Sequence, residues 1–354
     1  MVIIDGRRAG PLLAVLAAVV LTGCTAGAGA APVSDTTAGV TSTLSDPTPV
    51  AGSPSPNIPM TSDAPVGSVT PEQLPVDPVF TERVVQLAPG TVDEASGIAA
   101  SVGNPGAYFL IDDGRDGIFA VASDGSLLAD IAVDGMSKVE AEALSGGGCG
   151  STPGQGSPAD RCLYIGGIGD NASQREDIVV LRIAEPDLAA PPTEPVPADE
   201  WRYTYPDGPR DAESMMVAAD GSIVIVTKPY QGKSPTRIYR GTPGGGELEF
   251  VREFTPPSPV MTLRTLFTGN DAVDTSAAPG RVLLLTYDEV QQYTAPDPTA
   301  DITSFPDWPH HRLPMFSLPQ AEGITGEVEG CGYVVASEAG PGGDRGSLAF
   351  IGCS

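Results

Sequence analysis

The stretch that decides the fold runs from residue 205 to residue 228 and reads Tyr205-Pro-Asp-Gly-Pro-Arg-Asp-Ala-Glu-Ser-Met-Met-Val-Ala-Ala-Asp-Gly-Ser-Ile-Val-Ile-Val-Thr-Lys228. It begins with a turn, which is followed by a short strand that starts with Asp211 and Glu213 and ends at a tight turn, Asp220-Gly221. A second, apolar strand follows and has a polar end. Two such strands joined by an Asp-Gly turn predict a β-hairpin.

The same pattern recurs five times along the chain. Each copy has an opening, usually acidic, then a short strand, a turn, an apolar strand, a loop, a third strand and a fourth. The openings are Glu94-Ala-Ser-Gly-Ile, Glu140-Ala-Glu-Ala-Leu, Asp211-Ala-Glu-Ser-Met, Gly269-Asn-Asp-Ala-Val and Gln320-Ala-Glu-Gly-Ile. They lie 46, 71, 58 and 51 residues apart. Four-stranded repeats of this period are typical of a β-propeller.

The strands that follow the openings predict an all-β domain of five blades. The second strands are expected at 107–112, 162–167, 222–227, 281–286 and 332–337, the third at 117–122, 177–183, 236–240, 289–293 and 347–351, and the fourth at 127–133, 201–205, 248–254 and 312–318. The fifth copy has no fourth strand of its own. We expect Phe80–Leu87 to complete that blade and close the ring, which leaves no exposed sheet edge there. Six blades are the main alternative, and an open β-sandwich is a weaker third because it would not explain the repeated openings.

The N-terminus predicts export and lipid anchoring. Arg7 and Arg8 precede an apolar run that is too short to span a bilayer, and this run ends in Leu21-Thr22-Gly23-Cys24. The last four residues look like a bacterial lipobox, so residues 1–23 would be the signal peptide and Cys24 the lipidated N-terminus. The alternative is a plain secretory signal with an incidental cysteine. Two acyl chains give stable anchoring, on the outer face of the cell membrane.

Composition separates a tether from the folded domain. Residues 24–78 contain no Lys, no Arg and no aromatic residue, and such a stretch cannot bury enough apolar surface to order itself. We therefore expect a disordered tether over 24–78 and a single propeller domain over 79–354. The net charge of −26, from 45 acids and 19 bases, disfavours nucleic acid as a partner because nucleic acid needs a basic patch. The membrane is then expected as a partner only through the lipid anchor, and the domain is expected to be a monomer.

The four remaining cysteines predict two disulfides, which an exported domain permits. Cys149 and Cys162 flank a short loop. For the other pair, residues that face each other in a hairpin of 331–338 with 346–353 sum to 684, as do Cys331 and Cys353. A zinc site of all four cysteines is the alternative, but the closely paired ligands of such sites are absent.

The acidic openings predict the functional site. The first strand of each propeller blade lines the central channel, so equivalent residues converge on its axis. We assign this position to Ser96, Glu142, Glu213, Asp271 and Glu322, with Glu94 and Asp211 two residues earlier on the same side of their strands. Asp112 at one channel mouth and Asp170 in a glycine-rich turn are added as candidates.

Several carboxylates in one channel cannot all be ionised and unpaired. Two of them about 6 Å apart repel by roughly 3 kcal/mol at an effective dielectric constant near 20. An all-oxygen ligand set suits Ca²⁺, with Mg²⁺ as second choice. The alternative is structural: the acids cap the blade starts and pair with Lys138, Arg210, Lys228 or Arg264.

One segment carries a family resemblance. Leu163-Tyr-Ile-Gly-Gly-Ile-Gly-Asp-Asn-Ala-Ser-Gln-Arg-Glu-Asp-Ile, followed by Glu185-Pro186, resembles uncharacterised secreted propeller-like proteins and lipoproteins of actinobacteria. The Asp-Ala-Glu of 211–213, the Thr-Tyr pair of 286–287 and the Glu-Gly-Ile of 322–324 fit as well. Two features depart from that family: Gly167 stands where an Asp is usual, and Ile111-Asp-Asp-Gly114 replaces a fuller His-Asn-Asp-Ser-Gly run. The resemblance implies a fold and a cellular address, but no activity.

Two classes of function fit these observations. The favoured one is a non-enzymatic propeller lipoprotein that holds a cation and presents a face to an envelope protein or a small ligand. The alternative is a cation-dependent hydrolase of lactonase, esterase or phosphoester type, with Glu142, Glu213, Asp271 and Glu322 as ligands and Glu94 or Asp211 as base. Metal-dependent propeller hydrolases commonly add Asn or His to their ligands, and only Asn171 and Asn270 lie near this site in the sequence.

Overall fold

The computed structural model describes residues 79–149, 161–229, 235–257, 272–287, 289–315, 318–328, 330–340 and 345–354. The predicted signal peptide, Cys24 and the tether lie outside these residues. Within them, no helix is both long enough and apolar enough to cross a membrane.

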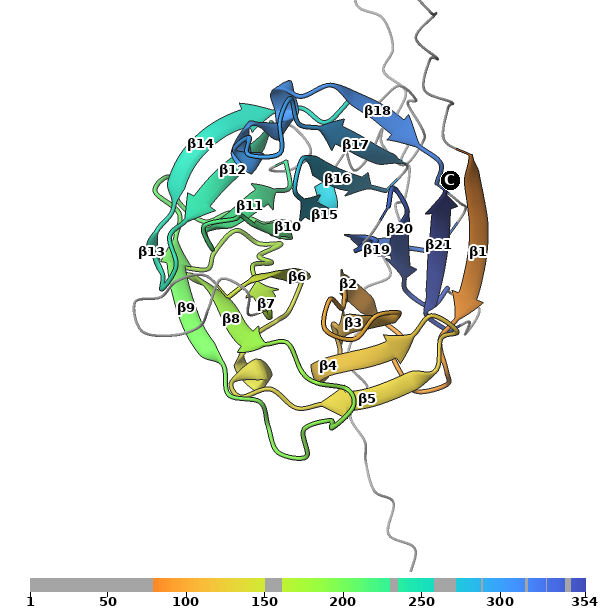
Figure 1. Cartoon of the computed structure of the whole chain (residues 1–354). Coiled ribbons are helices and arrows are strands. Elements are labelled where there is room, and N and C mark those ends of the chain that lie inside the picture. Colours follow the sequence, from red (N-terminus) through yellow and green to blue (C-terminus); the bar gives the residue numbers. More distant parts are fainter. Residues whose placement is uncertain are drawn as a thin grey trace, which may run out of the picture. The chain divides into compact units, whose positions relative to one another are not determined.

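Five antiparallel sheets stand around a central axis, as Figure 1 shows, and the prediction of a five-bladed β-propeller is confirmed. From the axis outward, blade 1 contains β2 (Ala95–Ala100), β3 (Ala107–Asp112), β4 (Arg115–Ala122) and β5 (Leu127–Ile131), and blade 2 contains β6 (Ala143–Gly148), β7 (Arg161–Gly167), β8 (Ile178–Ala184) and β9 (Asp199–Thr204). Blade 3 contains β10 (Ala212–Val217), β11 (Ile223–Thr227), β12 (Thr236–Gly241) and β14 (Glu249–Phe254), and blade 4 contains β15 (Ala272–Ala278), β16 (Arg281–Thr286), β17 (Val290–Thr294) and β18 (His310–Leu313). Blade 5 contains β19 (Ala321–Gly326), β20 (Tyr333–Ser337), β21 (Ser347–Cys353) and β1 (Phe80–Gln86).

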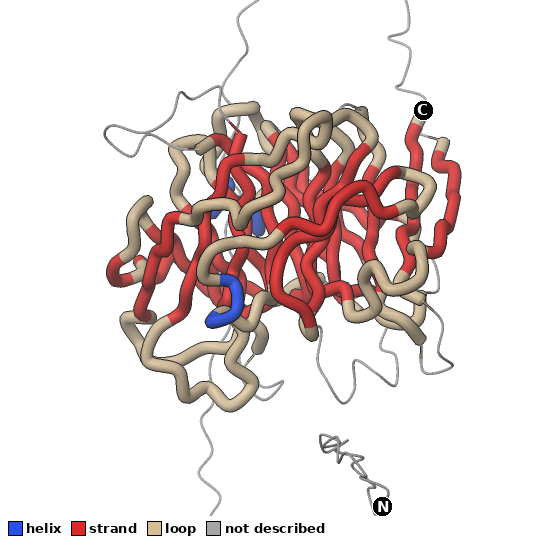
Figure 2. The backbone as a smooth tube through the Cα atoms, turned by 90° about the horizontal axis from the view of Figure 1, so that it is seen from below, coloured by secondary structure: helices blue, strands red, loops and turns tan. Residues whose placement is uncertain are grey.

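Little structure is added to the blades within the described residues. The two-residue strand β13 (Gly246–Glu247) pairs in parallel with β9 and so joins blade 3 to blade 2. Two short 3₁₀ helices, η1 (Met136–Lys138) and η3 (Ile302–Asp307), lie in connections. Strands cross the thickness of the ring and loops lie on its two faces, as Figure 2 shows. The faces are therefore where loop residues are available for binding.

The ring closes with the strand that the sequence predicted for this purpose. β1 pairs antiparallel with β21, from Phe80 opposite Cys353 to Gln86 opposite Ser347. The hairpin of β20 and β21 has the predicted register, with Tyr333 opposite Ile351. The edge of blade 5 is thus covered by a strand from the other end of the domain.

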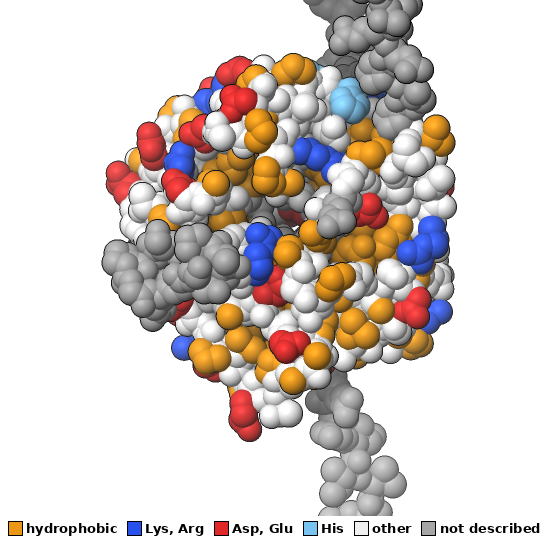
Figure 3. Space-filling view, in the orientation of Figure 1, with side chains coloured by type: hydrophobic (Ala, Val, Ile, Leu, Met, Phe, Trp, Pro, Cys, Tyr) orange, Lys and Arg blue, Asp and Glu red, His pale blue; other side chains and the backbone are white. Residues whose placement is uncertain are grey.

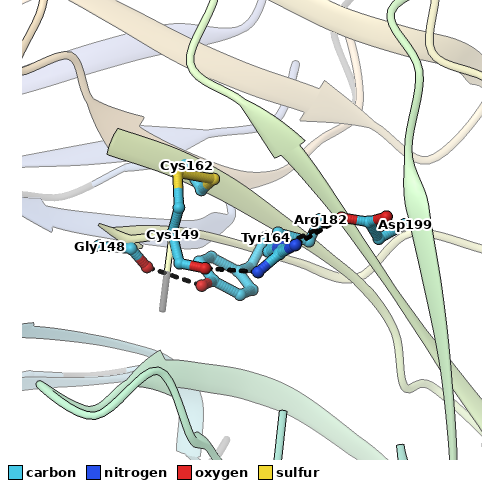
Figure 4. Close-up of a disulfide and its surroundings, with 6 residues drawn as sticks. All are labelled: Gly148, Cys149, Cys162, Tyr164, Arg182 and Asp199. Atoms are coloured by element: carbon cyan, nitrogen blue, oxygen red, sulfur yellow. Dashed lines mark hydrogen bonds and ion pairs between the residues drawn. A yellow bond between two sulfur atoms is a disulfide. The ribbon is translucent and has the colours of Figure 1, made fainter. Parts of the chain in front are cut away.

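Both predicted disulfides are present. Cys331 bonds Cys353, with Cα atoms 5.4 Å apart, and fixes the end of β21 where the ring closes. Cys149 bonds Cys162, with Cα atoms 4.9 Å apart. As Figure 4 shows, the buried Arg182 donates to the carbonyl oxygen of Cys149 and pairs with Asp199, so the second bridge is tied to the middle of blade 2.

The core lies between neighbouring blades, where the middle strands are buried on both faces. Completely buried aromatic rings recur in these layers, namely Tyr164, Tyr203, Tyr239, Tyr293, Tyr333, Phe109, Phe119 and Phe305. Burying one large apolar side chain stabilises a fold by about 1.5–3 kcal/mol. Four of these five tyrosines have a hydrogen-bonded hydroxyl group: Tyr203, for example, donates to the carbonyl oxygen of Thr242 over 2.7 Å. These apolar layers hold the first strands in place around the axis.

Polar side chains tie the first strand of one blade to the backbone of the next. Ser96 on β2 donates to the carbonyl oxygen of Ala141 over 3.0 Å, and Thr325 on β19 accepts from the backbone N–H of Ala100 over 3.0 Å. The strands also approach closely: a Cβ atom at Gly97 would lie 2.7 Å from the backbone nitrogen of Leu144, so only glycine fits there. The channel walls are therefore held by specific contacts as well as by apolar packing.

Candidate functional site

A polar pocket of about 200 Å³ lies at the end of the channel where the first strands begin. Its lining residues are Ser96, Asp113, Glu142, Asn171, Glu213, Tyr287, Gln320, Glu322 and Glu338. Three of the predicted acids, Glu142, Glu213 and Glu322, therefore come together here. We call this the acidic pocket.

β-Bulges set the direction of these side chains. The pairing of first with second strand shifts between Ala95 and Gly97, between Ala212 and Ser214, and between Ala321 and Gly323. The extra residue in each bulge is Ser96, Glu213 or Glu322. A bulge re-aims a side chain and is frequent beside binding sites. In blade 2, Glu142 lies directly before β6 and reaches the pocket without a bulge.

The fourth opening was aligned wrongly by two residues. β15 shows the same shift between Ala272 and Asp274, and Ala272 faces Thr286 as Ala212 faces Thr227. Val273 is therefore equivalent to Glu213. Asp271 is equivalent to Asp211 and lies outside the described residues. The sequence carries the correct signal, because an alanine follows Glu94, Glu140, Asp211, Asp271 and Gln320 alike.

Four further residues lie at the pocket that the sequence did not predict as part of the site. These residues directly follow the second strand of their blades: Asp113 after β3, Lys228 after β11, Tyr287 after β16 and Glu338 after β20. Asp113, Tyr287 and Glu338 line the acidic pocket, and Lys228 binds Glu213 inside it. The signal was a polar residue directly after the apolar second strand in four of the five blades; in blade 2 this position is Ile168.

Lys228 and Glu213 form the ion pair of the site. Their side chains are only 14% and 17% exposed. Burial lowers the pKa of Lys228, but the carboxylate of Glu213 more than offsets this effect, so the net pKa is raised and the ammonium group stays charged. Among the described residues, no ion pair reaches Asp113, Glu142, Glu322 or Glu338. One cation therefore faces five carboxyl groups.

Burial and mutual repulsion raise the pKa values of the unpaired acids. Burial raises the pKa of Glu142 to about 8, with added repulsion from Glu213 and Asp113. Burial together with Glu213 raises the pKa of Glu322 to about 7, and burial with Glu94 raises that of Glu338 to about 7. Near neutral pH the pocket therefore holds protons that a bound cation could displace.

The other predicted site residues hold loops around the pocket. Asp112 accepts from the backbone N–H groups of Asp93, Glu94 and Gly114 over 3.0–3.3 Å. The carboxylate of Asp170 accepts from the backbone N–H of Arg175 over 2.7 Å, and that of Asp211 accepts from the backbone N–H of Asp170 over 2.8 Å. In this structure the three carboxylates accept from backbone N–H groups of turns and so position neighbouring residues.

The glycine-rich segment that carries the family resemblance packs directly on the acidic pocket. A Cβ atom at Gly169 would lie 2.7 Å from the carboxylate oxygen Oε1 of Glu142, and Asn171 reaches the pocket lining. Glu185, from the same segment, accepts from the backbone N–H of Gly103 over 2.8 Å and thereby ties blade 2 to blade 1. The motif thus shapes one wall of the pocket and one blade contact.

The described acids do not form a site for direct metal coordination. Among the described residues, no three carboxyl, imidazole or thiol groups converge closely enough to hold a metal ion by direct coordination. The pocket is also larger than a bare ion.

Comparison with known proteins finds only distant structural similarity. No protein-family model and no curated protein sequence matches the chain. The PQQ-bound aldose sugar dehydrogenase of Streptomyces coelicolor matches with a TM-score of 0.43 and 12% identity over 77% of this chain and 99% of that chain. Glutaminyl cyclase of Myxococcus xanthus has a TM-score of 0.42 and 13% identity over 78% and 96%, and the exo-β-1,3-galactanase of Clostridium thermocellum has 0.44 and 13% over 77% and 62%. Similarities this weak carry no conclusion about ligand or reaction.

Proposed function

We propose that the chain is an exported, lipid-anchored binding protein that holds a cation in its acidic pocket. Ca²⁺ is the first candidate and Mg²⁺ the second. In this proposal the propeller presents the pocket face to an envelope protein or a small ligand. The predicted hydrolase stays an alternative.

The charge imbalance of the pocket carries the proposal. Asp113, Glu142, Glu322 and Glu338 share a small, partly enclosed space with the single ion pair of Lys228 and Glu213. Empty, such a pocket must keep protons on its acids, which the raised pKa values reflect. A divalent cation would neutralise two carboxylates and release their protons.

The chemistry of the donors points to a hard cation. All the charged ligating groups of the pocket are oxygens, and Asn171 and Gln320 add amide oxygens. Ca²⁺ accepts six to eight oxygen ligands in a flexible geometry and commonly keeps water among them, whereas Mg²⁺ retains several waters. Extracellular Ca²⁺ modules bind with dissociation constants of about 10⁻⁴ to 10⁻³ M. Such an affinity is useful only outside the cytoplasm, where the predicted signal sequence would place the domain.

Thermal unfolding of the full chain tests the proposal. Midpoints are measured in EDTA and with 10 mM Ca²⁺ or Mg²⁺ for the unaltered protein, for Glu142→Gln/Glu322→Gln and for Glu249→Gln. Glu249 is exposed on β14, away from the pocket, and serves as the matched control. At the affinities above, about 10 mM Ca²⁺ stabilises the fold by about 1.4–2.7 kcal/mol, a rise of roughly 2–5 °C. We expect this rise in the unaltered protein and in Glu249→Gln, and its loss in the double variant.

No shift with either ion would reject the cation site. An equal shift in the double variant would place the ion elsewhere. Hydrolysis of esters or lactones that depends on Ca²⁺ and disappears in the double variant would instead favour the hydrolase.

A further inference from the structure

A second and larger cavity lies at the opposite end of the channel. It has a volume of about 640 Å³ and is lined by the far ends of the five first strands and by the turns that follow them. Figure 3 looks onto this face, where the centre of the ring is hollowed. No residue lines both this cavity and the acidic pocket. We call it the apolar cavity.

The floor of the apolar cavity receives one buried side chain from each first strand. These are Ile98, Leu144, Met216, Thr275 and Ile324, each at most 2% exposed. On β2, β10 and β19 they lie two or three residues beyond Ser96, Glu213 and Glu322, so they separate the two ends of the channel. Above them the walls are built mainly from alanine, glycine, proline and valine, and two exposed valines, Val102 and Val328, stand in the lining.

The charges around the apolar cavity nearly cancel. Its lining contains two bases, Arg161 and Arg240, and three acids, Asp220, Asp301 and Glu327. Arg240 binds Asp220 over 2.6 Å and Asp301 over 2.9 Å, so three of the five are already paired. A ligand with a charged head would therefore find no strong field here, in contrast to the acidic pocket.

One polar group in the floor lacks a partner. The hydroxyl group of Thr275 is buried and has no hydrogen-bond partner in the described part of the chain. Leaving a buried hydroxyl unpaired is unfavourable, and such groups usually find a partner. Less than 1 Å² of this oxygen is accessible, so a ligand can reach it only after the Thr275 side chain rotates about χ1. The partner that a ligand would then supply is a neutral oxygen that accepts from the hydroxyl.

We propose that the apolar cavity binds an uncharged aliphatic ligand that carries one neutral oxygen, such as a medium-chain alcohol or ester. Ligand sites of 300–1,000 Å³ are commonly apolar, with a few polar groups that fix orientation. The aliphatic chain packs on the small apolar walls, and Thr275 is the orienting group. None of the described lining residues is aromatic, so flat aromatic ligands find no ring to stack against.

Displacement of a neutral fluorescent aliphatic probe, the methyl ester of cis-parinaric acid, from the full chain tests this proposal. The competitors are octan-1-ol, octanoate and octylammonium, which share a chain length and differ in head-group charge. We expect octan-1-ol to displace the probe at concentrations at least fivefold lower than either charged competitor. We also expect EDTA and Ca²⁺ to leave this displacement unchanged, which keeps the result separate from the cation site.

Variants locate the site. Ala218→Phe fills part of the apolar cavity and is expected to weaken probe binding at least tenfold; Ala278→Phe, at an exposed position of the same lining, replaces it if the first variant does not fold. Thr275→Val should weaken octan-1-ol binding by about three- to tenfold without lowering the unfolding midpoint. Thr236→Val is the matched control, because Thr236 also has a buried unpaired hydroxyl but lines neither pocket.

Four results would overturn the proposal. They are no displacement by octan-1-ol, tighter binding of octanoate or octylammonium, unchanged probe binding in a folded Ala218→Phe or Ala278→Phe protein, and equal octan-1-ol affinity in Thr275→Val and Thr236→Val.

Discussion

The two ends of the channel are built from the same five strands and differ in almost every chemical property. At one end, a pocket of about 200 Å³ collects five carboxyl groups, one of which, that of Glu213, is paired with Lys228. At the other end, a cavity of about 640 Å³ has mostly apolar walls and nearly balanced charge. On β19, Glu322 belongs to the first and Ile324 to the second. Two residues along a strand are enough to change the character of the channel.

Local backbone geometry explains the contrast. The bulges at Ser96, Glu213 and Glu322 turn an extra side chain toward the acidic pocket before regular pairing begins. Beyond the bulge the strands are regular, and their side chains alternate between the channel and the sheet interior. A propeller can thus keep a charged site and an apolar site on one axis, provided that the layer between them is tightly held.

The most destructive test of this division is Asp274→Ala. Asp274 is fully buried on β15 and accepts from the backbone N–H groups of Ile324 and Thr275, each over 2.7 Å. Burial raises its pKa well above the usual value, although both hydrogen bonds oppose this. Alanine would leave two buried N–H groups unpaired, at about 1–3 kcal/mol each. We expect at least about 3 kcal/mol less stability in urea unfolding, and weaker binding at both ends.

The control for this prediction is Asp274→Asn. The amide keeps one acceptor oxygen for these N–H groups, so Asp274→Asn should lose less stability than Asp274→Ala. If Asp274→Ala unfolds at the same urea concentration as the unaltered protein, the contact between blades 4 and 5 does not hold the layer between the two ends.

A sharper test disturbs the acidic end alone. Lys228→Ala leaves Glu213 largely buried among other carboxyl groups, without its cation. Removing one partner of a fully buried pair costs about 3–5 kcal/mol, and because these side chains keep some exposure we expect about 2–3 kcal/mol at pH 7. Adding Glu213→Gln to this variant should restore part of the loss, while octan-1-ol binding stays unchanged throughout. A double variant that is as unstable as Lys228→Ala would show that packing of the lysine, and not its charge, is what matters.

The sequence predicted the blades better than the site because the two depend on different information. Strand positions follow from apolar runs and turns, and the predicted 107–112 and 281–286 agree with β3 and β16 residue for residue. The pairing of Cys331 with Cys353 followed from the constant sum of the residue numbers that face each other in a hairpin. The site, in contrast, depends on single positions: Asp271 was aligned with Glu213 because acidic residues were matched, whereas the pairing of Ala272 with Thr286 makes Asp271 equivalent to Asp211. The apolar cavity depends on how separate blades meet, and no single repeat contains that information. Glu338, in contrast, could have been found from the polar residues that directly follow four of the second strands.

The mildest test uses pH to separate the ends. The folded-state pKa of Glu142, about 8, lies above its ordinary value because of burial first and then repulsion. The folded protein therefore binds this proton more tightly than the unfolded chain does, so the associated stability is complete below about pH 4.5 and is lost as pH rises through 8. Glu322 and Glu338, near 7, act in the same direction. In EDTA the unfolding midpoint should fall by a few degrees between pH 5 and pH 9.

Glu142→Gln should flatten this fall and be more stable than the unaltered protein at pH 9, whereas Glu249→Gln should follow the unaltered curve. Carboxyl groups whose pKa is lowered, such as Asp297 through its hydrogen bond from Thr299, change stability only at lower pH. They therefore do not contribute to the change between pH 5 and pH 9. Ca²⁺ should stabilise more strongly at pH 8 than at pH 6, because fewer protons then compete for the same oxygens. Affinity for octan-1-ol should stay constant across the range. A parallel change at both ends would mean that the buried layer transmits the charge state of the acidic pocket to the apolar cavity instead of isolating the two.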